Sequence, residues 1–283
     1  MRESFTLLPA DEVSPVDLHA AFGAAFADYL LGPSDLPLTQ WPSFIARQCV
    51  RLDASRVALA GGELRAFALA APRPDQPRWR LGTMGVVPAA RGSGAAQILL
   101  DDFIARAGAA GQRGVELECF AQNQRALRLY ASRGFEVVHA LHGYRGMPVV
   151  GAEETSQAPV QAVALADAFA WLDAAGRCDA ALPLQVMPAS LRALPVHLQA
   201  WRSGRAQLIA RAAPGGTVTV HSLVDQDGAQ AAAGRLLREL AQRFPGQPVW
   251  VPQLQREDLG GLALQRLGWQ RLPLHQVLMR KDW

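Results

Sequence analysis

Hydrophobic positions follow two different periods along the first part of the chain. From Asp17 to Leu31 apolar residues recur every three or four positions, which predicts an amphipathic helix, and a second helix is expected over 42–52. Strands are predicted over 57–60 and 64–71, because the Gly61-Gly62 pair between them is typical of a hairpin turn.

The pattern then alternates between strand and helix. The predicted order is a strand over 79–87, a helix that follows Gly92-Ser93-Gly94, a strand over 115–120, a helix over 123–133, and a strand from Phe135. The first of these helices carries an apolar stripe at Ala96, Leu99, Leu100, Phe103 and Ala107. The sequence therefore predicts a mixed α/β fold.

Periodicity is lost near residues 148–159, which reads as a linker between two domains at 1–147 and 160–283. Beyond it the order of elements repeats in part. We expect strands over 208–212 and 217–224, a helix with apolar positions at 233–244, a strand over 249–251, a helix over 257–267 and a final strand to Met279.

The last elements of the two predicted halves can be aligned in sequence. Asn123, Tyr130 and Gly134 correspond at one offset to Glu257, Leu264 and Gly268, whereas the preceding helices match better at an offset three residues longer. Four elements in the same order indicate an internal duplication, with a shorter loop in the second copy.

Composition narrows the class of protein. The chain has 283 residues, enough for about two domains, and half of them are apolar. The net charge of +3 is spread over arginines without a basic run, which argues against nucleic-acid binding. Lys281 is the sole lysine, so a Walker-type phosphate loop is excluded; the arginine-rich, lysine-poor composition is typical of a GC-rich bacterial genome.

No apolar run is long enough to span a bilayer, and the first residues do not resemble a signal peptide. We therefore expect a cytoplasmic protein that does not interact with membranes. Cys49, Cys119 and Cys178 are far apart and have no metal-ligand spacing, so we expect three buried, reduced thiols and no metal.

The chemistry is concentrated in the stretch from Val86 to Ala96. Small residues here connect a strand to a helix, so backbone N–H groups and the helix N-terminus are free to bind a pyrophosphate. A dinucleotide site is the obvious alternative, but Gln97 stands where its third glycine is required, and the chain does not begin with the expected βαβ units.

Two motifs in order carry a family resemblance. Arg91-x-x-Gly94-x-Ala96 follows Val86-x-Pro88, and Asn123-x-x-Ala126-x-x-Leu129-Tyr130-x-x-x-Gly134-Phe135 comes about 30 residues later. Together they resemble the GNAT (GCN5-related) N-acetyltransferases over residues 2–147. The second half resembles the same fold weakly, so the whole chain looks like a tandem acetyltransferase with a degenerate C-terminal repeat.

The resemblance implies a fold, a coenzyme and a set of site residues. Each half is expected to hold a mixed, mostly antiparallel sheet flanked by helices. Acetyl-CoA would bind through the backbone of Met84 and Val86, through Asn123, and through a loop at the start of the helix, made of Arg91, Gly92, Ser93, Gly94, Ala95, Ala96 and Gln97. Tyr130 would bind beside the sulfur and act as the general acid.

The general base is not identified by the sequence. The stretch 81–85 lacks the carboxylate that many family members carry there. Glu116 and Glu118 alternate with apolar residues and are interpreted as a solvated strand face, although one of them acting through water stays possible. Asp28, Tyr29 and Asp35 are candidates for the acceptor pocket, whereas His139 and His142 are interpreted as structural.

The function predicted from the sequence is direct transfer of acetyl from acetyl-CoA to a small-molecule amine. Two alternatives stay open. One is a non-catalytic module that binds acetyl-CoA and regulates another protein; the other is a tandem acetyltransferase like mycothiol synthase, which needs its active site in the second half. The sequence does not predict the oligomeric state.

Overall fold

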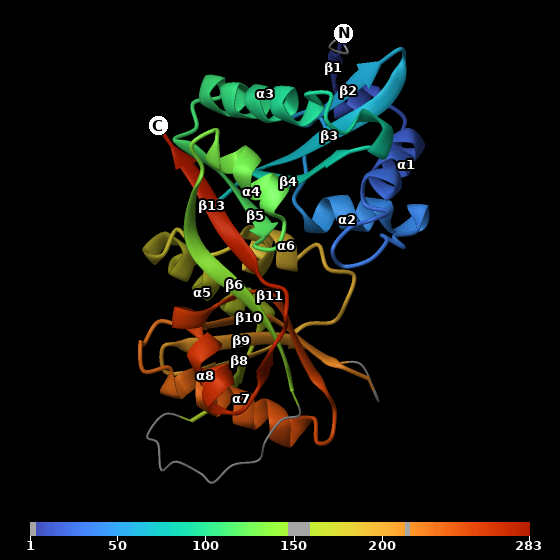
Figure 1. The fold of residues 1–283 in the computed structure, drawn as a ribbon. Coiled ribbons are helices and arrows are strands. Elements are labelled where there is room, and N and C mark those ends of the chain that lie inside the picture. The colour runs from blue at the N-terminus through green and yellow to red at the C-terminus, as the bar shows by residue number, and fades with distance from the viewer. Residues whose placement is uncertain (1–3, 147–158, 213–215) are drawn as a thin grey trace.

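A computed structural model describes residues 4–146, 159–212 and 216–283. Thirteen strands within these residues form one continuous sheet, in the order β1-β2-β3-β4-β5-β13-β6-β11-β10-β9-β8-β7, with β12 paired to β6 (Figure 1). Most neighbours are antiparallel, and helices flank the sheet. The predicted fold class is confirmed.

The N-terminal half supplies the first six strands and four helices. They are β1 (Thr6–Pro9), α1 (Pro15–Ala25), α2 (Trp41–Arg47), β2 (Arg56–Ala60), β3 (Glu63–Pro72), β4 (Arg78–Val86), α3 (Ala95–Ala109), β5 (Gly114–Phe120), α4 (Gln124–Ala131) and β6 (Glu136–Gly146). Local chemistry explains where the helices begin: the Ser14 hydroxyl accepts from the Val16 amide before α1, and Asn123 caps α4 in the same way.

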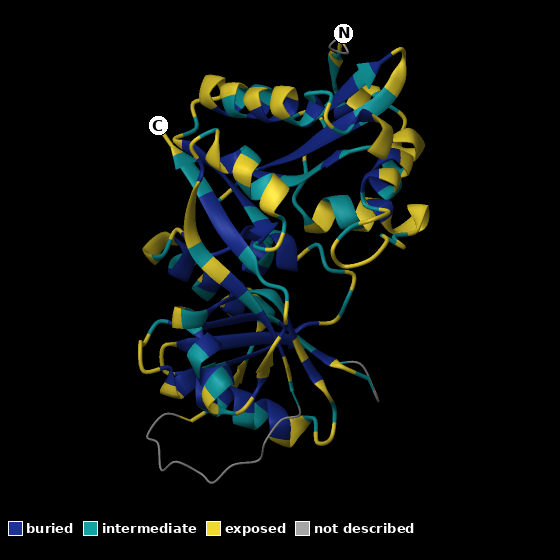
Figure 2. Cartoon of the chain, in the orientation of Figure 1, coloured by how far each residue is buried: buried dark blue, intermediate teal, exposed yellow. Residues whose placement is uncertain are grey.

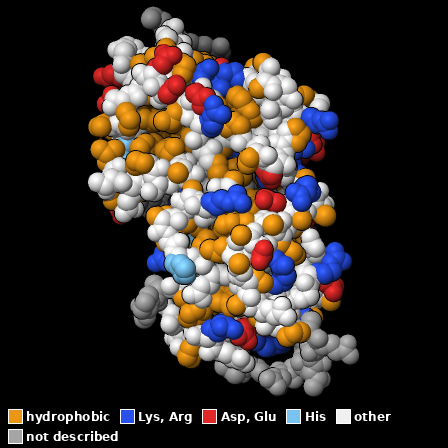
Figure 3. Space-filling view, turned by 180° about the vertical axis from the view of Figure 1, so that it is seen from behind, with side chains coloured by type: hydrophobic (Ala, Val, Ile, Leu, Met, Phe, Trp, Pro, Cys, Tyr) orange, Lys and Arg blue, Asp and Glu red, His pale blue; other side chains and the backbone are white. Residues whose placement is uncertain are grey.

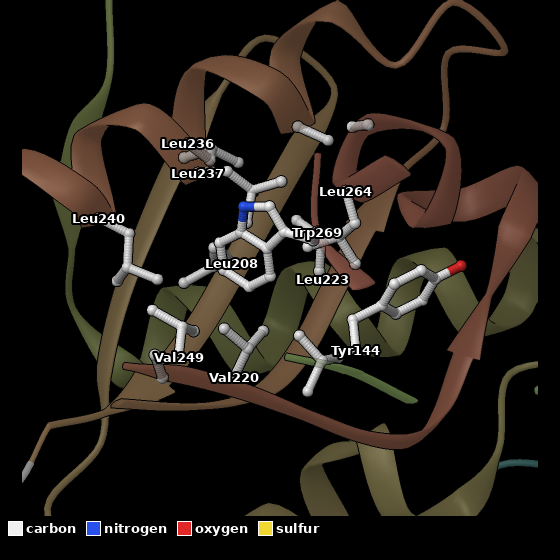
Figure 4. Packing of buried hydrophobic residues seen from close by; sticks show 14 of the residues in the cluster. Tyr144, Leu208, Val220, Leu223, Leu236, Leu237, Leu240, Val249, Leu264 and Trp269 are labelled. Carbon is white, nitrogen blue, oxygen red and sulfur yellow. The ribbon is translucent and has the colours of Figure 1, made fainter. Parts of the chain in front are cut away.

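The C-terminal half repeats this order of elements. It contains β7 (Gln161–Val163), α5 (Leu165–Cys178), α6 (Pro188–Leu191), β8 (Gln199–Ser203), β9 (Ala206–Arg211), β10 (Val218–Asp225), α7 (Ala231–Arg243), β11 (Val249–Arg256), α8 (Gly261–Arg266), β12 (Gln270–Arg271) and β13 (Gln276–Asp282). In Figure 4 the ring of Trp269 lies among the leucines of α7 and the neighbouring strands, at the centre of the core of this half.

The two halves exchange strands. The last strand, β13, lies in the N-terminal part of the sheet between β5 and β6, where Met279 pairs with Leu117 (Figure 1). In return, the end of β6 lies between β11 and β12, where Tyr144 pairs with Val251 and Arg271. Each half therefore completes its sheet with a strand of the other, and the predicted boundary between them is crossed twice.

Helices cover both faces of the N-terminal part of the sheet. On one face α3 and α4 pack on a core that contains Leu99 and Phe103; on the other, α1 and α2 pack on a core that contains Phe22 and Phe67. The strands between these layers are the most buried part of the half (Figure 2).

Strands β4 and β5 pair in parallel over four residues only and then separate. Pairing runs from Arg78 and Gly114 to Leu81 and Leu117. Immediately after Leu81, Gly82 forms a bulge against β3, since Leu81 pairs with Ala70 and Thr83 with Leu69. Beyond the bulge, no strand of the described residues pairs with the β5-facing edge of β4.

Several predicted elements need correction in extent. The first two helices end earlier, at Ala25 and Arg47, and the predicted helix over 257–267 is a 3-10 turn followed by α8, because Gly260 (φ 144°) interrupts it. Nearly all of the predicted linker, like most of the turn near Pro214, lies outside the described residues.

The prediction of three buried thiols is wrong for two of them. Only Cys119 is buried; Cys49 is partly exposed and Cys178 is exposed, and all three are free. None of the described helices has the length and hydropathy to cross a membrane.

Candidate active site

A cavity of about 1040 Å³ lies where β4 and β5 separate. Its wall combines β4, β5 and α4 with α1 and the turn that follows it, so the cavity reaches both faces of the sheet. It therefore has one side under α3 and α4, and a second side under α1 and α2. Figure 3 shows hydrophobic side chains gathered on the face of the molecule formed by α1 and α2.

The free edge of β4 lies on the first side. The Val87 amide donates to the Arg65 carbonyl of β3 at 2.9 Å. Because successive N–H groups of a strand point in opposite directions, the amides of Val86 and Met84 point away from β3, toward the space left by β5. The two residues named from the sequence thus offer backbone groups to a ligand that binds like a strand.

The glycine loop stands at the end of this edge. Gly92 (φ 86°) and Gly94 (φ 100°) have left-handed backbones, and a Cβ at either position would meet no atom within 4 Å. The glycines are therefore required by conformation. Ala95, Ala96 and Gln97 form the first turn of α3, whose amides have no carbonyl partner within the helix, while the Ser93 hydroxyl lies 3.4 Å from the Ala95 amide.

Arg91 makes an ion pair rather than pointing freely into the loop. Its two terminal nitrogens donate to Asp28 at 2.5 and 2.6 Å, and one also donates to the Ala25 carbonyl at 3.2 Å. Hydrogen bonding to Arg91 holds the pKa of Asp28 below its usual value. Arg91 thereby ties the glycine loop to the end of α1.

Three weakly acidic groups lie together at the end of β5. Tyr130 is buried, and burial, followed by the proximity of Cys119 and Tyr29, raises the pKa of its phenol. Burial likewise raises the pKa of Cys119 to about 12 and that of Tyr29 to about 12, the latter partly offset by a hydrogen bond with Asn123. Tyr130 therefore keeps its proton throughout the physiological range.

The second side of the cavity holds a buried polar cluster around Arg80. Its Nε donates to Glu118 at 2.6 Å and one terminal nitrogen donates to Gln48 at 3.0 Å. The Gln185 amide, which comes from the C-terminal half, donates to Glu118 and accepts from the other terminal nitrogen of Arg80.

The interpretation of Glu116 and Glu118 as a solvated face is wrong. The Glu116 side chain has no exposed area and accepts from Arg73 at 2.5 Å and from Arg280 at 3.0 Å; that of Glu118 is 1% exposed. Both do lie on the face opposite to the apolar residues of β5, as the alternation predicted. That face is covered by the C-terminal half, which the pattern of one strand does not reveal.

Only some of the other candidate residues line the cavity. Asp28 and Tyr29 line the cavity, whereas Asp35 is exposed outside it. His139 and His142 do not line it; His142 stacks on His275 at 5.0 Å between ring centres. Among the described residues no group of three or more potential ligands is placed to hold a metal ion.

The cavity is also lined by polar residues that the sequence motifs did not indicate, among them two arginines of α4 and two glutamines of the C-terminal half. Arg125 and Arg128 lie on α4 and make no ion pair with any described residue, while Gln185 and Gln276 come from the C-terminal half. The two arginines are three positions apart on the predicted helix that follows Asn123, so the sequence pattern could have indicated them. The sequence does not indicate that the two glutamines belong to the site, because only the tertiary structure brings them to the cavity.

The site thus combines a split between parallel strands with a glycine-rich helix start beside it. Residues 24–135 match the sequence model of the acetyltransferase (GNAT) family. These residues are about two fifths of the chain, and over them the chain is similar to that family, which agrees with the prediction of an acyltransferase. No curated protein matches the sequence.

Solved structures extend the likeness of fold to the whole chain. A GCN5-related N-acetyltransferase from Anabaena variabilis is 14% identical, with a TM-score of 0.67 over 99% of this chain and 73% of its own. One from Sphaerobacter thermophilus is 16% identical, with a TM-score of 0.65 over 98% of this chain and 95% of its own. A putative acetyltransferase from Pyrococcus horikoshii is 14% identical, with a TM-score of 0.64 over 100% and 90%.

Proposed function

We propose that this protein transfers an acetyl group from acetyl-CoA to the amine of a small molecule, in a ternary complex formed at the split between β4 and β5. The observation that carries the proposal is the cavity itself. It joins a free strand edge and a glycine-rich helix start on one face of the sheet to a pocket lined by α1 and α2 on the other. Two molecules that bind on opposite faces would meet at the split.

The residues present suit the coenzyme. The left-handed glycines leave the loop open, and the first amides of α3 are unpaired within the helix, as a pyrophosphate requires. The amides of Met84 and Val86 are oriented to bind a pantetheine arm, and Arg125 and Arg128 on α4 add positive charge for the phosphates. The bound coenzyme supplies an activated acetyl thioester.

Groups of the protein then stabilise the charge and transfer the proton of the reaction. The amine nitrogen forms a bond to the acetyl carbon while the carbon–sulfur bond breaks, so the amine loses one proton and the sulfur gains one. An amide of the β4 edge stabilises the charge that develops on the carbonyl oxygen. Tyr130, kept neutral by burial, donates the proton to the sulfur.

For the opposite proton transfer we propose Glu118, acting directly or through water. It precedes Cys119 on β5 and lies on the acceptor side of the split. Asp28, the other carboxylate among the described lining residues, is held by Arg91 in a bidentate pair. Arg80 keeps Glu118 in place, so its position is fixed before the acceptor binds.

The C-terminal half is proposed to be a degenerate copy of the first, within the predicted boundaries at 160–283, that binds no coenzyme. Its equivalent of the cavity, beside the ends of β10 and β11, has a volume of about 10 Å³. This observation disfavours the alternative in which the second half is catalytic. The free thiols suit the reducing cytoplasm, where we place the protein.

Thiol release from acetyl-CoA, measured with and without a panel of amines, tests the proposal. Amine-dependent release with an acetylated product supports it. Tight binding of acetyl-CoA without any release would instead establish the non-catalytic regulatory module. Calorimetry under the same conditions gives the number of coenzyme sites, which we expect to be one.

A further inference from the structure

The acceptor side of the cavity has an apolar wall. Phe22, Phe26 and Phe44 line it, and their rings pack against one another, with Phe22 at 4.9 Å from Phe26 and 5.2 Å from Phe44 between ring centres. At the mouth, Leu30 and Leu31 expose 44% and 59% of their surface. Exposed leucines at the mouth of a cavity are typical of a binding site whose apolar ligand buries them.

The charges on the same side are already neutralised. The Asp28 carboxylate accepts both terminal nitrogens of Arg91, and the Glu118 carboxylate accepts from Arg80 and Gln185. Taken over the whole cavity, the described lining holds five arginines but only these two carboxylates. A polycationic acceptor would therefore bring charges for which the wall has no free partner.

A carboxylate on the acceptor is equally unsupported. Each of the three guanidinium nitrogens of Arg80 already donates to a side-chain oxygen, of Glu118, Gln48 or Gln185. Arg125 and Arg128, which form no ion pair with a described residue, lie on α4 on the coenzyme side of the sheet. The described wall of the acceptor side thus offers the carboxylate of an amino-acid acceptor no guanidinium that is free of other partners.

We propose that the acceptor is a primary monoamine carried on an apolar, preferably aromatic, body, and that Leu31 at the mouth and the uncharged polar floor of Gln48 and Gln185 select it. The inference rests on the proposed function, because it names the acceptor class of the same site. The reacting nitrogen is the single polar end of such a molecule, so it alone reaches the polar cluster at the split.

Matched amines test the proposal by kcat/KM, measured as thiol release with acetyl-CoA. Phenethylamine carries one amine on an aromatic body, spermidine carries several charges and no ring, and phenylalanine adds a carboxylate to the same ring. Burial of the ring predicts that phenethylamine exceeds spermidine by about tenfold to a hundredfold. Phenylalanine should fall below phenethylamine. A preference for spermidine or phenylalanine would overturn the proposal.

A pair of variants tests where selection occurs. Leu31→Glu places a carboxylate at the mouth and should raise the spermidine-to-phenethylamine ratio of kcat/KM by about two- to fivefold. Val16→Glu makes the same change at a position that is 55% exposed on α1 but outside the cavity lining, so its ratio should equal that of the unmodified protein. Equal ratios in both variants would remove Leu31 from the proposal.

Binding without reaction separates this inference from the proposed function. Calorimetry with protein saturated by CoA, which holds no acetyl group, measures the affinity for each amine alone. Binding of phenethylamine without any acetylation would contradict the proposed function and keep the acceptor class. Acetylation confined to polyamines or amino acids would keep the function and contradict the class.

Discussion

The two halves of the molecule each contain a place where parallel strands separate, yet only one of them is open. In the first, β4 and β5 part after Leu81; in the second, β10 and β11 pair only at residues 218–219 with 249–250. Each split begins beside a bulge, formed by Gly82 in β4 and by His221 in β10. The cavities differ in volume, at about 1040 Å³ and 10 Å³.

Side chains of the second half occupy the positions that a ligand would take in the first. In α3, Ile98 donates the first helical bond to Gly94, and in α7 Gly234 donates the corresponding bond to Gln230. The amide just before Gly234, that of Ala233, donates at 2.9 Å to the buried Asp225 carboxylate. A carboxylate thus stands at the helix start where the first half leaves amides free.

The strand edge is filled in a similar way. Gln255 of β11 reaches across the split and donates to the Leu223 carbonyl of β10 at 3.1 Å, and the Gln230 side chain bridges Glu257 and Ala263 beyond it. These contacts support the proposal that the second half keeps the fold but binds no coenzyme. The backbone geometry is kept, and the polar groups it exposes are bonded internally.

The largest effect is expected from Tyr130→Phe, which removes the proposed proton donor and keeps the ring. General acid catalysis contributes roughly 10²- to 10⁴-fold, so kcat should fall by that factor while acetyl-CoA affinity stays the same. Tyr144→Phe, which alters a buried phenol of the second core, serves as the control and should retain full kcat. A loss within about threefold for Tyr130→Phe would assign the proton to water or another group.

The helix starts provide the second test. Gly94→Glu adds a side chain at φ 100° and a negative charge beside the free amides of α3, so acetyl-CoA affinity measured by calorimetry should fall by about a hundredfold or more. A normal circular dichroism spectrum would show that the fold survives. Unchanged affinity would remove the glycine loop from the site.

The matched change in the second half is Asp225→Ala, which takes away the carboxylate at the start of α7. It should lower the free energy of unfolding by about 1–3 kcal/mol, because two backbone amides lose their acceptor. The stoichiometry of acetyl-CoA should stay at one, since Gln255 still fills the strand edge. A second site appearing in this variant would mean that Asp225 alone closes the second half.

The strand exchange leads to a third prediction. Met279 is in the last strand of the chain, yet it is 3% exposed in the N-terminal core, so Met279→Ala should cost about 2–5 kcal/mol. Because β13 and β6 cross between the halves, thermal unfolding should give a single transition at a lower temperature. Two resolved transitions, with only one of them shifted, would show that the halves fold independently.

Much of the first half was predictable because its motifs are local. The glycine loop, Asn123 and Tyr130 lie where their spacing placed them, at a helix start and on the helix after β5. The burial of Glu118 and its hydrogen-bond partners were not predictable, because Arg80 is remote from it in sequence and Gln185 is farther still. The exchange of β13 was hidden for the same reason: alternation predicts a strand but not its neighbour.

The smallest expected effect is a change in stability with pH that arises at the bulge of the second half. The bulge residue there is His221 of β10, whereas that of the first half is Gly82 of β4. Burial, with Arg211 and Arg47 nearby, lowers the pKa of His221 to about 4, and its Nε2 has no hydrogen-bond partner among the described residues. Between pH 6.5 and 4 the unfolded chain therefore binds a proton that the folded chain does not, so stability is lost as the pH falls through this window and is unaffected above it.

His221→Gln cannot titrate and isolates this contribution from that of the carboxylates, which both proteins share. The difference in unfolding free energy between the two proteins should change by about 1–3 kcal/mol from pH 7 to pH 4, toward the lower end because the ring is only partly buried. Denaturant titrations at the two pH values measure it. A constant difference would show that the imidazole is protonated equally in the folded and unfolded states, which would contradict the prediction for His221.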